Sequence, residues 1–257
     1  MTPVFTKTIT ILQKTRFSDA WYVIATAALA AGGQSRIIPR VYQQAVQGLG
    51  PAPLSKQPAI PEWQSDLPRR QVVRKMRETL VKSTILVGVA HCIEASWVLS
   101  GALEEGDKDD TFVREGYDND GQALKRGSRG LGRIYQHNDA SLMEKFGKAG
   151  IPDIAWLSRA ITYGQLLEPI RPETPKAAID IFENSLLTLT CLMGKKAYRE
   201  VMWHLRGCLR IGMSAEEVEL CQQAIEACLA EVQEYQRDDT EVKVMPRVTD
   251  VTEEDTL

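Results

Sequence analysis

The amino-acid sequence predicts an all-α fold. Apolar residues recur at the three- and four-residue spacing of a buried helix face along most of the chain. Glycine, proline, serine and aspartate stand where these runs begin and end, as expected of helix boundaries. No segment shows a convincing strand pattern, in which apolar and polar residues alternate.

The composition is that of an ordinary water-soluble globular protein. The chain has 257 residues, of which 44% are hydrophobic and 25% are charged, which is enough for one sizeable domain or two small ones. The net charge of −3 gives no reason to expect a nucleic-acid partner. The apolar run Trp21–Ala31 is too short to cross a bilayer, so we expect no membrane partner either.

The first 68 residues predict a helical extension followed by a linker. Ser18 and Asp19 are expected to cap a helix over residues 21–31, and a second helix is expected over residues 36–47. Five prolines between residues 51 and 68 then predict an extended linker and a domain boundary. The segment is basic and poor in acids, so a mitochondrial address, or less strongly a secretory one, is the alternative to the cytoplasm.

The helical domain is expected to span residues 69–236. Residues 69–103 predict one long helix or a kinked pair, loosened at Gly88. The acidic stretch after it, within residues 104–129, predicts a solvated mobile loop, with a hard-cation site as the alternative.

Further helices are expected over residues 131–148, 153–167 and 176–194. The apolar inner face of the last contains one acid, Glu183, whose side chain could point inward. Residues 237–257 are acidic and lack periodicity, so they predict a disordered tail.

The clearest helix pattern lies between Lys195 and Gln223. Gly212 is expected to end one helix, and Ser214 with Glu217 forms the capping box that starts the next. On the first helix Glu200 and His204 are four residues apart, so they share one face. An apolar stripe beside them is expected to bury that helix: Met202, Leu205, Cys208 and Leu209.

This region resembles the carboxymuconolactone decarboxylase family, which belongs with the alkylhydroperoxidase-D proteins. The resemblance rests on the Glu200–His204 stretch, on Cys208–Gly212 and on the Ser214–Val218 helix start. Earlier residues add to it in the same order as in the family: Gly130–Tyr135, Pro152-Asp153 and Tyr163-Gly164. It covers about residues 130–230.

The resemblance implies an alkylhydroperoxidase-D-like helical bundle with an extra N-terminal helical region. It also implies a homodimer or larger homo-oligomer and chemistry without a cofactor. The Cys-x-x-Cys motif of the peroxidase branch is absent, because Ala197 and Glu200 stand at its two positions. By resemblance, His204 is the general acid and base and Glu200 is its orienting partner, with Glu183 as a third candidate acid.

The predicted function is therefore acid–base catalysis on a small carbonyl or lactone acid, as a lyase or an isomerase. Trp203 and Tyr163 are candidate substrate-binding residues, and core packing is their alternative role. Arg199, Arg206 and Arg210 could contact a carboxylate or lie at a subunit interface.

Two other readings stay open. The pair of His204 and Glu200 is structural if the protein is a non-catalytic oligomeric or ligand-binding member of the fold. An atypical thiol peroxidase would instead need an exposed, acidic thiol at Cys191 or Cys208. No metal site is predicted, because His91 and His137 lie in separate segments without ligand spacing.

Overall fold

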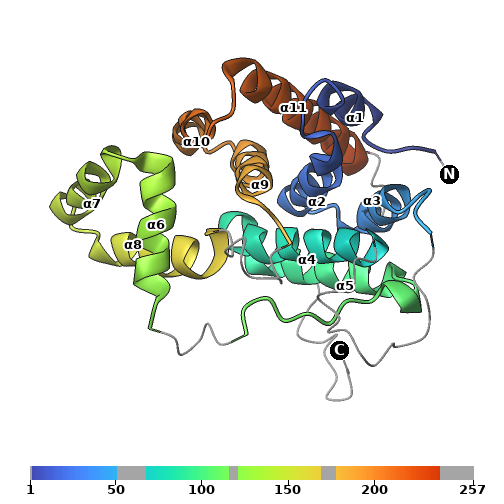
Figure 1. Ribbon diagram of the computed structural model, residues 1–257, viewed down its shortest axis with the longest axis horizontal. Coiled ribbons are helices and arrows are strands. Elements are labelled where there is room, and N and C mark those ends of the chain that lie inside the picture. Colours follow the sequence, from blue (N-terminus) through green and yellow to red (C-terminus); the bar gives the residue numbers. More distant parts are fainter. Residues whose placement is uncertain (1, 51–67, 116–120, 169–177, 238–257) are drawn as a thin grey trace.

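The computed structural model describes residues 2–50, 68–115, 121–168 and 178–237, and within these ranges the fold is all-α, without strands (Figure 1). The predicted fold class is therefore confirmed. The main helices are α1 (Thr6–Leu12), α2 (Trp21–Gly32), α3 (Ile38–Ala45), α4 (Pro68–Val87), α5 (Val89–Ala102), α6 (Ala123–Tyr135), α7 (Asn138–Lys148), α8 (Pro152–Trp156), the π-helix η5 (Leu157–Leu167), α9 (Ile181–Gly194), α10 (Tyr198–Arg210) and α11 (Ala215–Arg237).

The N-terminal helices belong to the main hydrophobic core. Helix α2 is apolar all round and buried along nearly its whole length, and it packs against α4, α9 and α11. A helix with this composition can exist in water only when other helices surround it. The described part of the predicted N-terminal extension therefore lies at the centre of the fold, and residues 21–32 form a core helix.

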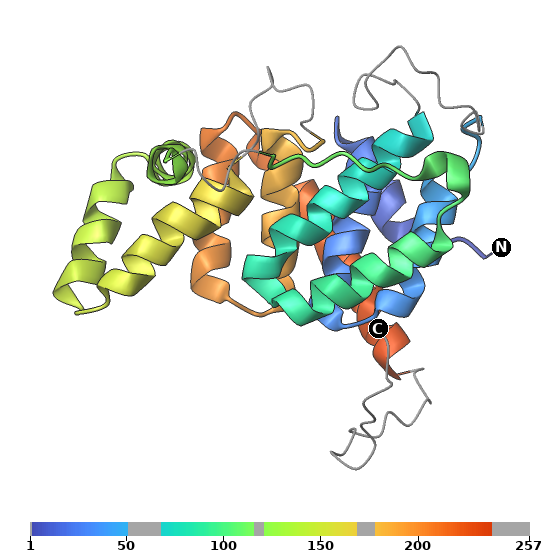
Figure 2. The same ribbon diagram turned by 90° about the horizontal axis from the view of Figure 1, so that it is seen from below.

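A smaller lobe projects from the main body (Figure 2). It consists of α6, α7, α8 and η5, and its own apolar core contains Leu131, Ile134, Tyr163 and Leu167. The backbones of α6 and η5 approach very closely: a Cβ added at Gly127 would lie 1.7 Å from the carbonyl oxygen of Arg159. Glycine at positions 127 and 164 thus permits a close contact between the backbones of α6 and η5 that a residue with a side chain would prevent.

Two predicted helices are divided differently in the structure. The chain reverses at Gly88, where φ is 109°, so α4 and α5 are an antiparallel pair lying side by side (Figure 2). The expected helix over residues 131–148 is broken at Gln136, with φ of 49°, and its first half begins already at Ala123. Residues 153–167 continue from α8 into the π-helix η5.

The acidic connection after α5 is not a solvated loop over its described residues. Asp107 and Asp109 are buried and form ion pairs with Arg69 and Arg74 of α4, at 2.8 and 2.6 Å. The hydroxyl of Tyr42 also donates a hydrogen bond to Asp107. The arginines thus take the place that a cation would have in the alternative interpretation, and they fix the connection to the main core.

The predicted caps around the C-terminal helices are confirmed. The Ser214 hydroxyl accepts the backbone N–H of Glu217, and the Glu217 carboxylate accepts the backbone N–H of Ser214. Gly212 ends the preceding helical region with φ of 97°. Ser18 and Asp19, by contrast, lie inside a short 3₁₀ turn, and neither side chain caps α2.

Charged residues of α4 are buried where the main body meets the lobe. The Glu78 side chain is 3% exposed and accepts two hydrogen bonds of 2.8 Å from Arg114. Lys82 is 1% exposed, and its ammonium group donates to the carbonyl oxygens of Leu166, Leu167 and Glu168 at the end of η5. These bonds attach the π-helix to α4.

No helix among the described residues is both long and apolar enough to cross a lipid bilayer. The predicted proline-rich linker falls largely outside the described residues, and so does nearly all of the predicted C-terminal tail.

The Glu78→Ala variant tests the importance of this buried network. Removing the carboxylate leaves Lys82 and Arg114 as uncompensated buried cations, so we expect a loss of about 3 to 5 kcal/mol in the free energy of unfolding. The matched control is Glu144→Ala, which removes an exposed i, i+4 pair with Lys148 and should cost less than about 1 kcal/mol. Urea denaturation measures both, and equal losses would contradict this role of Glu78.

Candidate functional site

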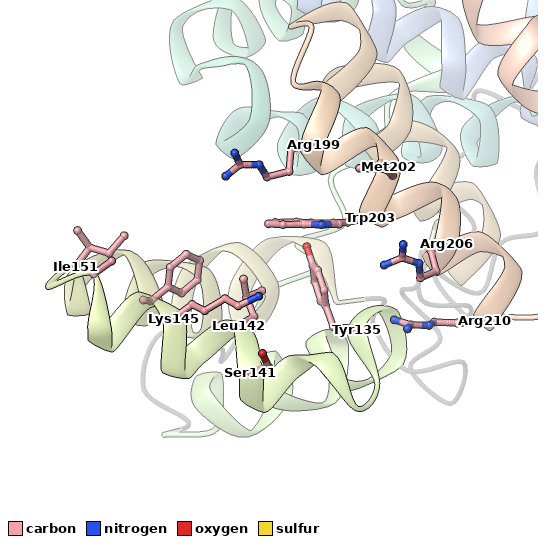
Figure 3. A pocket seen from close by; sticks show the side chains of 12 residues that line it. Tyr135, Ser141, Leu142, Lys145, Ile151, Arg199, Met202, Trp203, Arg206 and Arg210 are labelled. Atoms are coloured by element: carbon pink, nitrogen blue, oxygen red, sulfur yellow. The ribbon is translucent and has the colours of Figure 1, made fainter.

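A pocket of about 640 Å³ opens between α10 and the lobe (Figure 3). One wall comes from α10, and the other comes from the end of α6, from α7 and from the turn after α7. Its volume is in the range of small-molecule sites. The lining residues are Tyr135, Ser141, Leu142, Lys145, Phe146, Ala149, Ile151, Arg199, Met202, Trp203, Arg206 and Arg210.

The pocket is strongly cationic. Three arginines and Lys145 line it, and no acidic residue does. One of the arginines, Arg210, donates to the carbonyl oxygen of Ile134 at 2.7 Å, which holds its side chain against α6. Among the residues that the structure describes, no carboxylate pairs with Lys145, Arg199 or Arg206. These three groups are therefore available to an anionic ligand.

Aromatic rings form the inner part of the pocket. Figure 3 shows the Trp203 ring between Arg199 and the hydroxyl of Tyr135. The ring of Tyr135 makes edge contacts with Trp203, Tyr163 and His204, with centroid distances of 5.9, 6.4 and 6.3 Å. A planar ligand could pack on the Trp203 face while its anionic group meets the arginines.

His204 lies behind this wall and does not line the pocket. Its side chain is buried, and its Nε2 atom lies 3.3 Å from the hydroxyl oxygen of Tyr163. Burial lowers the pKa of His204 to about 4, because a charged imidazolium would lose its water. His204 is therefore neutral near pH 7.

Glu200 does not serve as the partner of His204. No hydrogen bond or ion pair joins the two residues in the described part of the chain, and the pKa of His204 shifts in the direction opposite to that expected beside a carboxylate. Helical spacing places both residues one turn apart on α10 but does not require their side chains to meet. The polar group that does meet the imidazole of His204 is the hydroxyl of Tyr163, from the lobe.

Glu183 and the apolar stripe of α10 also differ from expectation. Glu183 is the third helical residue of α9, where it completes a capping box with Asp180 and forms an ion pair with Lys75. It does not line the pocket. Of the predicted stripe, Cys208 is buried as expected, whereas Met202 and Leu209 are 56% and 49% exposed. The buried face of α10 carries His204 beside Cys208.

The structure brings Trp203 to the pocket, as expected of a substrate-binding residue, and places Tyr163 behind it. It adds two lining residues that were not predicted as site residues, Tyr135 and Lys145. Tyr135 closes the Gly130–Tyr135 stretch that carries the family resemblance, which was its one signal. Lys145 has none, because an exposed lysine on a helix is the most ordinary of residues.

The described residues contain no cluster of three histidine, cysteine or acidic side chains that could hold a metal ion. All five cysteines are buried. Burial raises the pKa of the Cys191 and Cys208 thiols to about 12. Both properties are the reverse of what a peroxidatic thiol requires.

No protein-family model matches the chain, and the comparisons with curated proteins and with solved structures also find no match.

The burial of His204 predicts a specific loss of stability in acid. The unfolded state binds a proton at its ordinary pKa of 6.5 and the folded state only near 4, so stability falls as the pH decreases from 6.5 toward 4. Between pH 7 and 5 this single group should cost about 2 kcal/mol. In His204→Gln that part of the pH dependence should disappear from urea denaturation, and an unchanged dependence would contradict it.

The cysteines give a second prediction. In the folded protein we expect Cys191 and Cys208 to react with Ellman's reagent far more slowly than a free thiol, while all five cysteines react in guanidinium chloride. Single serine variants assign any reactive thiol. Rapid modification of either residue in the native protein would revive the peroxidase alternative.

Proposed function

We propose that this protein is a cofactor-independent acid–base enzyme that binds a small carboxylic acid in the pocket lined by Trp203 and moves a proton next to its carbonyl group. The observation that carries the proposal is the combination, in one place, of a cationic pocket and a buried neutral imidazole linked to it through tyrosine hydroxyls. The resemblance to carboxymuconolactone decarboxylases supports this function. It further implies that the protein is a homo-oligomer.

The positive charge of the pocket favours substrates that react through an enolate. When a proton leaves the carbon next to a carbonyl, or when a carboxyl group leaves as carbon dioxide, negative charge develops on the carbonyl oxygen. Arg199, Arg206 and Lys145 would bind the substrate carboxylate and stabilise that developing charge. An isomerase and a decarboxylase both pass through such an enolate.

The neutral state of His204 favours a reaction that begins by removing a proton. Near pH 7 His204 is in the form that accepts a proton, and a pKa lowered to about 4 makes it a weak base that returns the proton readily. An isomerisation, which takes a proton from one atom and returns it to another, therefore suits this site better than a reaction that needs a ready acid.

The second candidate is a ligand-binding protein without catalysis. The exposure of Arg199 and Arg206 to solvent favours it, because a pocket open at the rim excludes water less completely than most active sites do. Binding and turnover have to be measured separately.

Phenylpyruvate tests both functions. This planar aromatic 2-oxo acid exchanges the protons of its methylene group when it enolises, so deuterium uptake in D₂O, followed by proton NMR, reports catalysis. We expect saturable exchange above the buffer rate. Arg206→Gln should raise KM about tenfold, the loss expected for one charged hydrogen bond, whereas Arg237→Gln, an exposed arginine at the end of α11, should change nothing.

Quenching of tryptophan fluorescence by phenylpyruvate measures binding independently. Binding without exchange would favour the ligand-binding alternative. Neither binding nor exchange would contradict the proposed substrate class.

A further inference from the structure

A chain of hydrogen-bonding groups leads from the pocket to the buried histidine. Tyr135 lines the pocket, and Figure 3 shows its hydroxyl directed toward Trp203. The rings of Tyr135 and Tyr163 meet edge to face, with centroids 6.4 Å apart. The side-chain hydrogen bond between them lowers the pKa of Tyr135 and raises that of Tyr163. The hydroxyl of Tyr163 lies 3.3 Å from Nε2 of His204. Tyr163 and His204 are both buried, so water has little access to the inner part of this chain.

The proton of Tyr163 has two possible acceptors. A hydroxyl group has one proton, so Tyr163 can donate to Tyr135 or to His204, but not to both at once. In one arrangement His204 donates from Nε2 and the pocket hydroxyl donates into the pocket. In the other, Tyr135 donates to Tyr163 and Tyr163 donates to His204. Starting from the second arrangement, a shift of each proton along its hydrogen bond carries one proton from the pocket to Nε2 of the imidazole.

Resting on the proposed function, we infer that Tyr135 is the catalytic group that exchanges a proton with the substrate. Tyr163 and His204 are positioning residues that act through it: Tyr163 passes the proton on, and the buried imidazole of His204 accepts and returns it. Ser141 is the other hydroxyl group lining the pocket, but it lies on the exposed face of α7, and among the described residues nothing links it to His204.

The proton balance of the step is complete without a co-reactant. As a substrate C–H bond breaks, its proton goes to the oxygen of Tyr135, whose own proton goes to Tyr163, while the proton of Tyr163 goes to Nε2 of His204. The electron pair of the C–H bond stays on the substrate as an enolate, and His204 becomes a short-lived imidazolium, because burial favours its neutral form and drives the proton back. The reverse movement returns a proton to the enolate oxygen and restores the neutral imidazole.

The surroundings of the two tyrosines favour transfer over storage of charge. Burial is the main cause that raises the pKa of Tyr135; the hydrogen bond with Tyr163 lowers it in part, and Glu200 and Asp139 raise it. Burial likewise raises the pKa of Tyr163 well above its ordinary value, with Tyr135 and Asp139 adding to it. Neither hydroxyl therefore remains ionised near neutral pH. Glu200 thus raises the pKa of the pocket tyrosine, although among the described residues it forms no hydrogen bond with His204.

The backbone gives independent support. Tyr163 lies in the π-helix η5, an unusual conformation that occurs often at functional sites. The backbone N–H of Glu168 donates to the carbonyl oxygen of Tyr163 in the five-residue spacing of this helix. The π-helical turn therefore sets the direction in which the Tyr163 side chain leaves the lobe toward α10.

The nitrogen NMR shifts of His204 test the chain without a substrate. In wild type the Nε2 shift should lie between the values of a protonated and an unprotonated nitrogen. In Tyr135→Phe the proton of Tyr163 has only His204 as acceptor, so the shift should move to the unprotonated value. The matched control is Tyr198→Phe, which changes an exposed tyrosine on α10, the helix that carries His204. Identical spectra of wild type and Tyr135→Phe would overturn the chain.

Deuterium exchange of phenylpyruvate tests the catalytic role. Tyr135→Phe should lower kcat at least about 100-fold with KM changed less than about threefold. The solvent-isotope dependence should be curved in wild type, where several protons move together, and linear in Tyr163→Phe. Active wild type with an equally active Tyr135→Phe would overturn this inference alone, whereas inactive wild type would overturn the proposed function. Circular dichroism verifies that each variant is folded.

Discussion

The compensation of buried charge on α4 is the constraint on which the rest of the structure depends. This helix runs through the middle of the molecule, yet charged residues occupy several of its buried positions. Each of them would be very costly without a partner, so the partners must come from segments far away in sequence. Arg69, Arg74 and Glu78 bind residues of the connection after α5, and Lys82 binds the lobe.

The position of the pocket follows from these attachments. The carbonyl groups at the end of a helix lack partners within the helix, and at the end of η5 three cations supply them: Lys82 bonds to Leu166, Arg114 to Gln165 and Arg126 to Gly164. The π-helix is thereby fixed to α4. Because α6 packs on η5 and α10 packs on α6, the space between α10 and the lobe keeps its shape.

The electrostatics of the site separate two tasks. Cationic groups at the rim make the pocket favourable for an anion, and a neutral imidazole lies beneath them in a place where a positive charge is unfavourable. The tyrosine hydroxyls connect the two environments without adding charge to either.

The sequence by itself determined the helical class, the capping box at Ser214, the end of a helix at Gly212 and the choice of the His204 region, because helix periodicity and caps are local properties of the chain. It also pointed to Trp203 as a pocket residue. Only the tertiary structure decided that His204 meets Tyr163 and not Glu200, and that Tyr135 and Lys145 face the same cavity. The physical reason is that contacts between helices depend on how the lobe is attached to α4, through charge pairs that no spacing within one helix records.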